Sequence, residues 1–298
     1  MFFIKKFPVL AYFYLAIFFQ IILESFPISS SGHLKLLEII NQKFEIFFPI
    51  SLENFGLNFE ILHLPTIFIF FIFFQHNLKL LLINMFKSWK FLEKISIFIF
   101  IADFITVIFY FFFKYLNFDF PLWLGFFITG IYLFSLLFCT CHPELVSGSG
   151  SRIPGFAKAT PDKQVWDDSE TRTIKHAFLV GLVQGISLLP GISRFGSTFV
   201  ALRWLKYEPQ TAFFFSFLIE MPLLFAGVLK GFYSLHATNQ LLNLSNINLE
   251  VIIIIFMASF ISYQSLNLMK KIIEKNRVWM ISFYMLIPAM ISLYLSLG

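Results

Sequence analysis

A polar segment near the N-terminus interrupts an apolar run and carries side chains suited to phosphoryl chemistry. Gln20 and Glu24 are four residues apart, which puts them on one face of a helix. The chain then breaks at Pro27-Ile-Ser-Ser-Ser-Gly-His33, which supplies the hydroxyls of Ser29, Ser30 and Ser31. A serine hydroxyl can attack phosphorus when a base removes its proton, and His33 lies within three residues of Ser30. Glu24 can bind a divalent cation or orient His33, whereas Gln20 can only donate or accept hydrogen bonds.

A second polar break, Pro190-Gly-Ile-Ser-Arg-Phe-Gly-Ser-Thr198, supplies the positive charge that the first one lacks. The guanidinium of Arg194 can bind phosphoryl oxygens bidentately and stabilise their charge in the transition state. We expect a helix N-terminus after each break, with free N–H groups for an anion. The further candidates for substrate binding are the polar side chains of Gln20, Ser29, Ser31, Ser193, Ser197 and Thr198.

Each of these residues also has an interpretation without chemistry. Serine and threonine in membrane helices often bond their own backbone, an isolated arginine can extend to the membrane interface, and a lone glutamate can be a packing contact. His63 and Glu220 lie inside apolar segments, and a structural or supporting role is the favoured interpretation of both; Asp103 is unexplained. The placement of the charged and hydroxyl groups at two matched breaks is what the interpretation without chemistry leaves unexplained.

The elements that position these residues are membrane helices. Of the 298 residues, 58% are hydrophobic and 13% are charged, and the mean hydropathy is +0.80, whereas soluble domains carry roughly 25% charged residues. Lysine and arginine cluster between apolar runs, so nucleic-acid binding does not explain the net charge of +5. We predict an all-α polytopic membrane protein with six transmembrane helices at Phe59–Phe74, Ile95–Phe113, Pro121–Phe138, Thr211–Tyr233, Val251–Leu268 and Trp279–Leu297.

Two further apolar stretches, 7–40 and 176–205, contain the polar breaks and are predicted to be re-entrant helix–loop–helix hairpins. A shift of 164 residues aligns them without a gap, pairing Gln20 with Gln184, Ser29 with Ser193 and Gly32 with Gly196. Because each copy precedes three spans, the second copy is inverted in the membrane, and the site is expected where the breaks meet. The predicted units are a first repeat at 1–139, a polar cytoplasmic insert at 140–168 and a second repeat at 169–298.

Loop charges give the orientation. Two basic groups should be cytoplasmic, one between the first two spans (Lys79, Lys87, Lys90 and Lys94) and one between the last two (Lys270, Lys271, Lys275 and Arg277). Residues 234–250 contain no lysine or arginine and should lie outside. Lys5 and Lys6 disagree with this topology, because it puts the N-terminus outside. Cys139 and Cys141 are interpreted as unpaired structural cysteines, since a lone C-x-C lacks the ligands of a zinc site.

At the two breaks the sequence resembles the undecaprenyl-diphosphatase family linked to bacitracin resistance. The family motifs read here Gln20-Ile-Ile-Leu-Glu-Ser-Phe-Pro-Ile-Ser-Ser-Ser-Gly-His33 and Pro190-Gly-Ile-Ser-Arg-Phe-Gly-Ser-Thr198, and residues 214–222 are similar to the family's next helix. The resemblance covers nearly the whole chain apart from the insert. It departs from the family pattern at Phe195, which stands where a serine is usual, at Ile21, which replaces a usual glycine, and at Ser25.

The resemblance implies hydrolysis of undecaprenyl diphosphate to undecaprenyl phosphate and phosphate, which recycles the peptidoglycan carrier lipid. It implies a multi-pass protein of the bacterial inner membrane, a site facing the periplasm, and a divalent cation (Mg²⁺ or Ca²⁺); a homodimer is a further expected partner. By motif position Ser30 is the best candidate for the nucleophile, with an activated water as the alternative, and Glu24 and Gln20 occupy the metal or base position. His33 lies beside the phosphate, and Arg194 is the clamp, supported by Ser193 and Thr198.

Two other functions fit parts of this pattern. Inverted repeats with broken helices are also the architecture of secondary transporters, so the main alternative is a polyprenyl-phosphate flippase or another transporter of an anionic substrate. Phosphate release that Ser30→Ala abolishes would support the enzyme, whereas binding without release would favour transport. A purely structural membrane protein is the third interpretation, and it predicts that Arg194→Ala leaves substrate handling unchanged.

Overall fold

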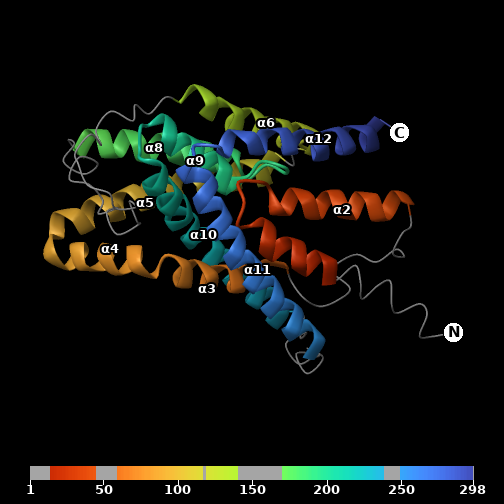
Figure 1. The fold of residues 1–298 in the computed structure, drawn as a ribbon, viewed down its shortest axis with the longest axis horizontal. Coiled ribbons are helices and arrows are strands. Elements are labelled where there is room, and N and C mark those ends of the chain that lie inside the picture. Colours follow the sequence, from red (N-terminus) through yellow and green to blue (C-terminus); the bar gives the residue numbers. More distant parts are fainter. Residues whose placement is uncertain (1–13, 45–58, 117–118, 140–169, 238–248, 298) are drawn as a thin grey trace.

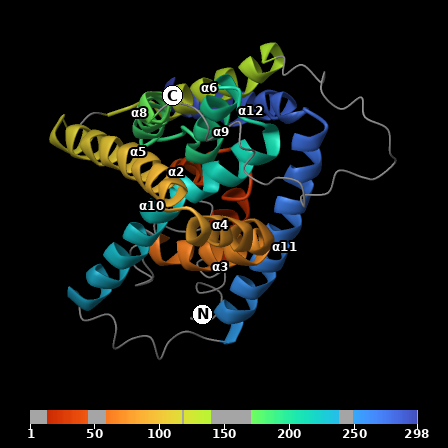
Figure 2. The same cartoon turned by 90° about the vertical axis from the view of Figure 1, so that its left-hand side faces the viewer.

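The computed structural model describes residues 14–44, 59–116, 119–139, 170–237 and 249–297, and within these ranges the chain is helical and has no strand. The insert predicted at 140–168 and the disagreeing Lys5 and Lys6 lie outside the described residues. Figure 1 shows α6 (Leu122–Ser135) beside α12 (Ile281–Leu297) along one edge of the molecule. Figure 2 shows α3 (His63–Phe73) and α4 (Gln75–Lys87) on the opposite side.

Both predicted hairpins are broken helices. The first has an apolar helix, Tyr14–Leu23, a turn, and then α2 (Ser30–Phe44). The second has α8 (Glu170–Ile186), a turn, and then α9 (Arg194–Trp204). A helix was expected after each break. Both helices are present, and they begin within the breaks, at Ser30 and Arg194, two positions that the 164-residue shift relates to each other.

All six apolar segments predicted to span the membrane are helical, but not all have the length of a simple span. Four are long and apolar enough to cross: α5 (Trp89–Leu116), α10 (Pro209–Ala237), α11 (Leu249–Glu274) and the segment Val278–Leu297, which contains η6 (Val278–Met280) and α12. A fifth counts only if η2 (Phe59–Leu62), α3 and α4 form one span, which is bent by 73°. The segment Leu122–Phe138, in which η3 (Leu136–Phe138) continues α6, is shorter.

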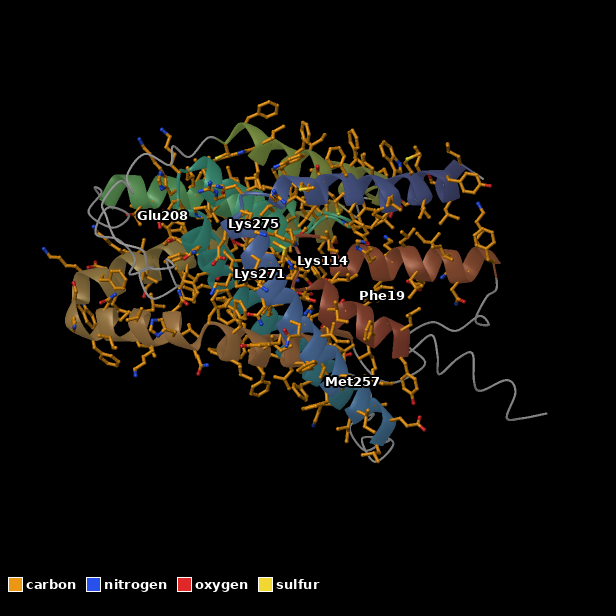
Figure 3. The ribbon with its side chains drawn as sticks, viewed as in Figure 1. Phe19, Lys114, Glu208, Met257, Lys271 and Lys275 are labelled. Carbon is orange, nitrogen blue, oxygen red and sulfur yellow. The ribbon has the colours of Figure 1, made fainter. Side chains whose placement is uncertain are left out.

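The basic region between the first two predicted spans is helical rather than a loop. Lys79 and Lys87 lie on α4, while Lys90 and Lys94 lie in the first turns of α5. At the other basic region, Lys270 and Lys271 lie near the C-terminal end of α11, which ends at Glu274. Figure 3 shows Lys271 and Lys275 near one end of α11 and Met257 toward the other. Positive charge therefore gathers at helix ends, as membrane helices require.

Each hairpin packs against helices of the other half of the chain. α2 contacts α12, and α9 contacts α6. The first helix of each hairpin also contacts the other half of the chain. In the second hairpin, α8 packs along α5. In the first hairpin, Ser25, which follows the helix Tyr14–Leu23, hydrogen-bonds Ser262 on α11. Outside this core, long aromatic rows of α5 are exposed, including Phe100, Phe104 and Phe111. Such a surface suits contact with lipid, and the chain is an integral membrane protein.

Candidate active site

The two breaks meet at two close contacts that the repeat relates to each other. A Cβ on Gly32 would lie 2.8 Å from Cα of Gly191, and a Cβ on Gly196 would lie 2.8 Å from the carbonyl oxygen of Pro27. Gly32 corresponds to Gly196 and Pro27 to Gly191 under the 164-residue shift. Gly191 also has a φ of 84°, which favours glycine. These glycines let two turns approach within the interior, so that two helix N-termini reach one place.

The helices that begin at the two breaks, α2 and α9, are capped in the same way. The hydroxyl oxygen of Ser29 accepts a hydrogen bond from the amide of Gly32 at 3.1 Å, and Ser193 accepts one from Gly196 at 3.0 Å. A serine cap satisfies one of the free amides in the first turn of a helix. Ser29 and Ser193 were expected to bind substrate. Both stabilise helix N-termini as caps, and both also line the pocket between the two turns.

This pocket brings together the main residues predicted from the sequence. Its polar lining comes from both hairpins and from α10: Glu24, Ser29, Ser30, Ser31, Ser187, Ser193, Arg194 and Glu220. Ser30 and Arg194, which are far apart in the chain, thus line one cavity. The first turns of α2 and α9 open onto it, and amides at helix N-termini favour anions. Gln20, His33, Ser197 and Thr198 do not line the pocket.

Glu24 is the centre of a hydrogen-bonded group. Its Oε1 accepts hydrogen bonds from the hydroxyl of Ser30 at 2.9 Å and from the side-chain amide of Gln20 at 3.0 Å. The same oxygen lies 3.3 Å from Nδ1 of His63, on the first turn of α3. Glu24 and Gln20 are buried, with exposed fractions of 7% and 3%. A buried carboxylate bonded to a serine hydroxyl is placed to accept its proton.

Arg194 forms an ion pair with a residue that was not predicted as part of the site. Its Nε lies 3.2 Å from Oε1 of Glu220 on α10, and both side chains line the pocket. Arg194 also interacts electrostatically with Glu24. The pair satisfies a charge that would otherwise cost roughly 3 kcal/mol in the membrane interior.

His33 is oriented away from Ser30. Its Nδ1 lies 2.6 Å from the carbonyl oxygen of Ser29, and its Nε2 lies 3.0 Å from the hydroxyl of Tyr284 on α12. Its ring also packs against Phe126. The contact with Tyr284 ties the first turn of α2 to the other half of the chain. The imidazole in contact with the Glu24 group is instead that of His63.

The other three candidates, Thr198, Ser197 and Ser31, differ in their contacts. The hydroxyl of Thr198 donates to the carbonyl oxygens of Arg194 and Phe195 in its own helix, at 2.8 and 3.1 Å. Ser197 is buried, and its hydroxyl has no hydrogen-bond partner among the described residues. Ser31 lies 3.4 Å from the hydroxyl of Ser29. Phe195 packs on Phe217, with ring centroids 4.5 Å apart, so an aromatic contact replaces the hydroxyl usual at that position.

His63 and Glu220, for which the sequence favoured a structural or supporting role, each contact a predicted site residue: His63 lies against Glu24 and Glu220 against Arg194. Both had one usable signal, because each is an ionisable side chain inside an apolar segment, which is costly unless it has a partner. The sequence did not identify those partners, since they lie on segments far away in the chain.

The residues of the site could supply some, but not all, of the ligands of a divalent cation. Among the described residues there is no group of three or more His, Cys, Asp or Glu side chains that could bind a metal alone. Glu24 nevertheless offers a carboxylate, and Oε1 of Gln20 is buried without a hydrogen-bond partner in the described part of the chain. Mg²⁺ commonly takes one or two carboxylates and completes its shell with water and substrate phosphate.

Comparison with known proteins agrees with the resemblance read from the motifs. The family model described as "Bacitracin resistance protein BacA" matches residues 13–291. The chain is 28% identical over 283 residues to the undecaprenyl-diphosphatase of Borrelia hermsii, covering 91% of this chain and 92% of that protein. It is 35% identical over 122 residues to undecaprenyl-diphosphatase 2 of Bacillus thuringiensis, covering 41% of this chain and 44% of the relative. The undecaprenyl-diphosphatase of Pelodictyon phaeoclathratiforme is 31% identical over 122 residues, which cover 41% of this chain and 42% of that protein.

Proposed function

The chain belongs to the bacitracin resistance protein BacA family, and from this premise we propose that it hydrolyses undecaprenyl diphosphate. The products are undecaprenyl phosphate and inorganic phosphate, and the reaction recycles the carrier lipid of peptidoglycan synthesis and confers bacitracin resistance. The observation that carries the proposal is the shared pocket of Ser30 and Arg194, with Glu24 2.9 Å from the serine hydroxyl. A nucleophile, a base and a phosphate-binding cation are the three groups that such a reaction requires.

In the proposed mechanism Ser30 attacks the terminal phosphorus while Glu24 accepts the hydroxyl proton. The bond from that phosphorus to the bridging oxygen breaks, and undecaprenyl phosphate leaves with the bonding electron pair. Water then attacks the phosphoseryl group, and the bond between phosphorus and the Ser30 oxygen breaks. Glu24 returns the proton it had accepted to that oxygen, which regenerates free Ser30, and both water protons leave with the phosphate as H2PO4−. Arg194 and the amides at the starts of α2 and α9 stabilise the charge on the phosphoryl oxygens throughout.

A divalent cation is part of the proposal, with Mg²⁺ or Ca²⁺ as the candidates. Glu24 and the unpartnered oxygen of Gln20 are the residues that would hold it. When bound, such a cation would offset phosphate charge. Glu24 remains the group that orients Ser30, because their hydrogen bond needs no further ligand.

We also propose the finer membrane arrangement. The chain would have six spans and two re-entrant hairpins in an inverted repeat, with a cytoplasmic insert, in the bacterial inner membrane and with the site facing the periplasm. The matched serine caps and the packing of each hairpin on helices of the opposite half support this arrangement. A homodimer is compatible with it.

The test follows conversion of undecaprenyl diphosphate to phosphate by purified protein in detergent with Mg²⁺ or Ca²⁺. Ser30→Ala and Arg194→Ala should each lower kcat at least about a hundredfold. Ser292→Ala is the matched control, because within the described ranges that buried hydroxyl bonds only carbonyls of its own helix, and it should retain activity. Trapping of a phosphoseryl species on Ser30 would identify the attacking group. Tight lipid binding with no phosphate release in the wild type would reject hydrolysis and favour the transport alternative.

A further inference from the structure

Glu220 lines the pocket, but the proposed reaction assigns it no step. It lies on α10 with an exposed fraction of 3%, and its carboxylate faces the same pocket as Ser30 and Glu24. Its one ion-pair partner among the described residues is Nε of Arg194. A second buried carboxylate in a pocket for a phosphate is unfavourable for binding, because its charge repels the ligand.

The geometry of the pair leaves part of Arg194 available. A guanidinium has five N–H donors, of which Nε supplies one and the two terminal nitrogens supply four. Glu220 lies against Nε, and within the described ranges no hydrogen bond reaches the terminal nitrogens of Arg194. A phosphate can therefore bind the terminal nitrogens while Glu220 keeps Nε, so the two anions share one cation.

We propose that Glu220 is a built-in counter-anion that orients Arg194 and weakens the binding of product phosphate. In the absence of substrate it neutralises Arg194 in the apolar interior. With phosphate bound, its charge opposes that of the phosphate across the same guanidinium, so phosphate leaves readily and the site turns over. Glu220 is thus a positioning residue that sets phosphate affinity, and it deepens the proposed function without replacing any of its steps.

Glu220→Gln tests this role, because the amide keeps the size of the side chain and removes its charge. Conversion of labelled undecaprenyl diphosphate is followed with increasing added inorganic phosphate. We expect the inhibition constant for phosphate to fall at least about tenfold, since removing a unit charge a few ångströms away is worth more than a tenfold change in binding at a protein-like dielectric. KM for the lipid should fall with it, and kcat should fall because product release slows.

Two comparisons sharpen the result. Glu220→Asp draws the carboxylate back from Arg194 and should give a smaller fall of the same sign, which keeps the test usable if Glu220→Gln does not fold. Glu60→Gln is the matched control, because Glu60 also pairs with a cation on α10, Lys230, but does not line the pocket. Its phosphate inhibition should equal that of the wild type. An inhibition constant that is unchanged or raised in both Glu220 variants would overturn the proposal.

The same comparison is possible without turnover, by measuring how inorganic phosphate raises the Tm of each variant. If the wild type does not convert the lipid, the proposed function fails, and the larger phosphate-dependent Tm shift expected for Glu220→Gln still decides the role of Glu220. If the wild type converts the lipid and the shift is unaltered, the role of Glu220 alone is rejected.

Discussion

Glu24 is the residue on which the first hairpin of the site depends, because three groups share one of its oxygens. Ser30 and the Gln20 amide donate to it, and His63 lies 3.3 Å away. A carboxylate that accepts hydrogen bonds in a buried position stays oriented without solvent. The orientation of Ser30 therefore depends on residues from a different helix, α3, as well as on its own turn.

His63 is expected to matter for the reaction through its contact with Glu24. His63→Ala leaves one side of the carboxylate without a partner, so kcat should fall about ten- to a hundredfold, as is typical when a partner that orients a reactive group is lost. The measurement is phosphate release under saturating lipid. His76→Ala is the control, because His76 is an exposed histidine on the neighbouring α4. Equal activities of the two variants would contradict this role.

At the scale of elements, the contact between the two hairpins depends on α6. Thr129 donates to the carbonyl oxygen of Gly191 at 3.1 Å and accepts from the amide of Ser193 at 3.0 Å. One turn earlier on the same helix, a Cβ on Gly125 would lie 1.9 Å from the carbonyl oxygen of Pro190. The second break is therefore held by one face of α6, which allows backbone contact only because it carries glycine.

Gly125→Ala should consequently separate α6 from the second break. The contact is with backbone, which cannot move aside cheaply, so the loss of stability should exceed the roughly 1–3 kcal/mol of ordinary overpacking. The Tm in detergent should fall, and phosphate release should be lost with it because Arg194 follows this turn. Gly227→Ala is the control, since its Cβ would meet only His63 at 3.7 Å and a helical glycine-to-alanine change is otherwise favourable. A Gly125→Ala protein as stable as the control would refute this account.

Sequence was sufficient for the elements whose signal is local. The breaks at Ser29 and Ser193 are recognisable because hydroxyls, proline and glycine interrupt apolar runs, and both serines do cap helices. The pairing of Glu220 with Arg194 and of His63 with Glu24 was not recognisable, because which face of α10 or α3 turns inward depends on packing between distant segments. His33 illustrates the same limit: its closeness to Ser30 in the chain suggested a base, but the first turn of α2 directs it to Tyr284.

The whole molecule presents an apolar exterior around a few paired charges. Its exposed surface includes rows of phenylalanine on α5 and residues such as Ile252, Phe256 and Phe260 on α11. A lipid environment makes each unpaired interior charge expensive, which explains why Arg194 and Glu220 occur together. The lengths of the helices alone leave four or five spans, because α3 and α4 bend by 73° at their junction.

The inverted arrangement predicts on which side of the membrane each helix end lies, which the helix lengths alone do not. An odd number of crossings in each repeat reverses the second one, so the basic ends of α4 and α11 should share the cytoplasmic side although they belong to different repeats. Single cysteines are introduced at Lys79, Lys275 and Glu250 in a protein whose two native cysteines, Cys139 and Cys141, are changed to serine. In intact cells an impermeant maleimide should label Glu250→Cys alone, whereas a permeant reagent should label all three. Labelling of Lys79→Cys together with Glu250→Cys would mean that the halves are not inverted, and the site would then not be formed by two hairpins entering from opposite faces.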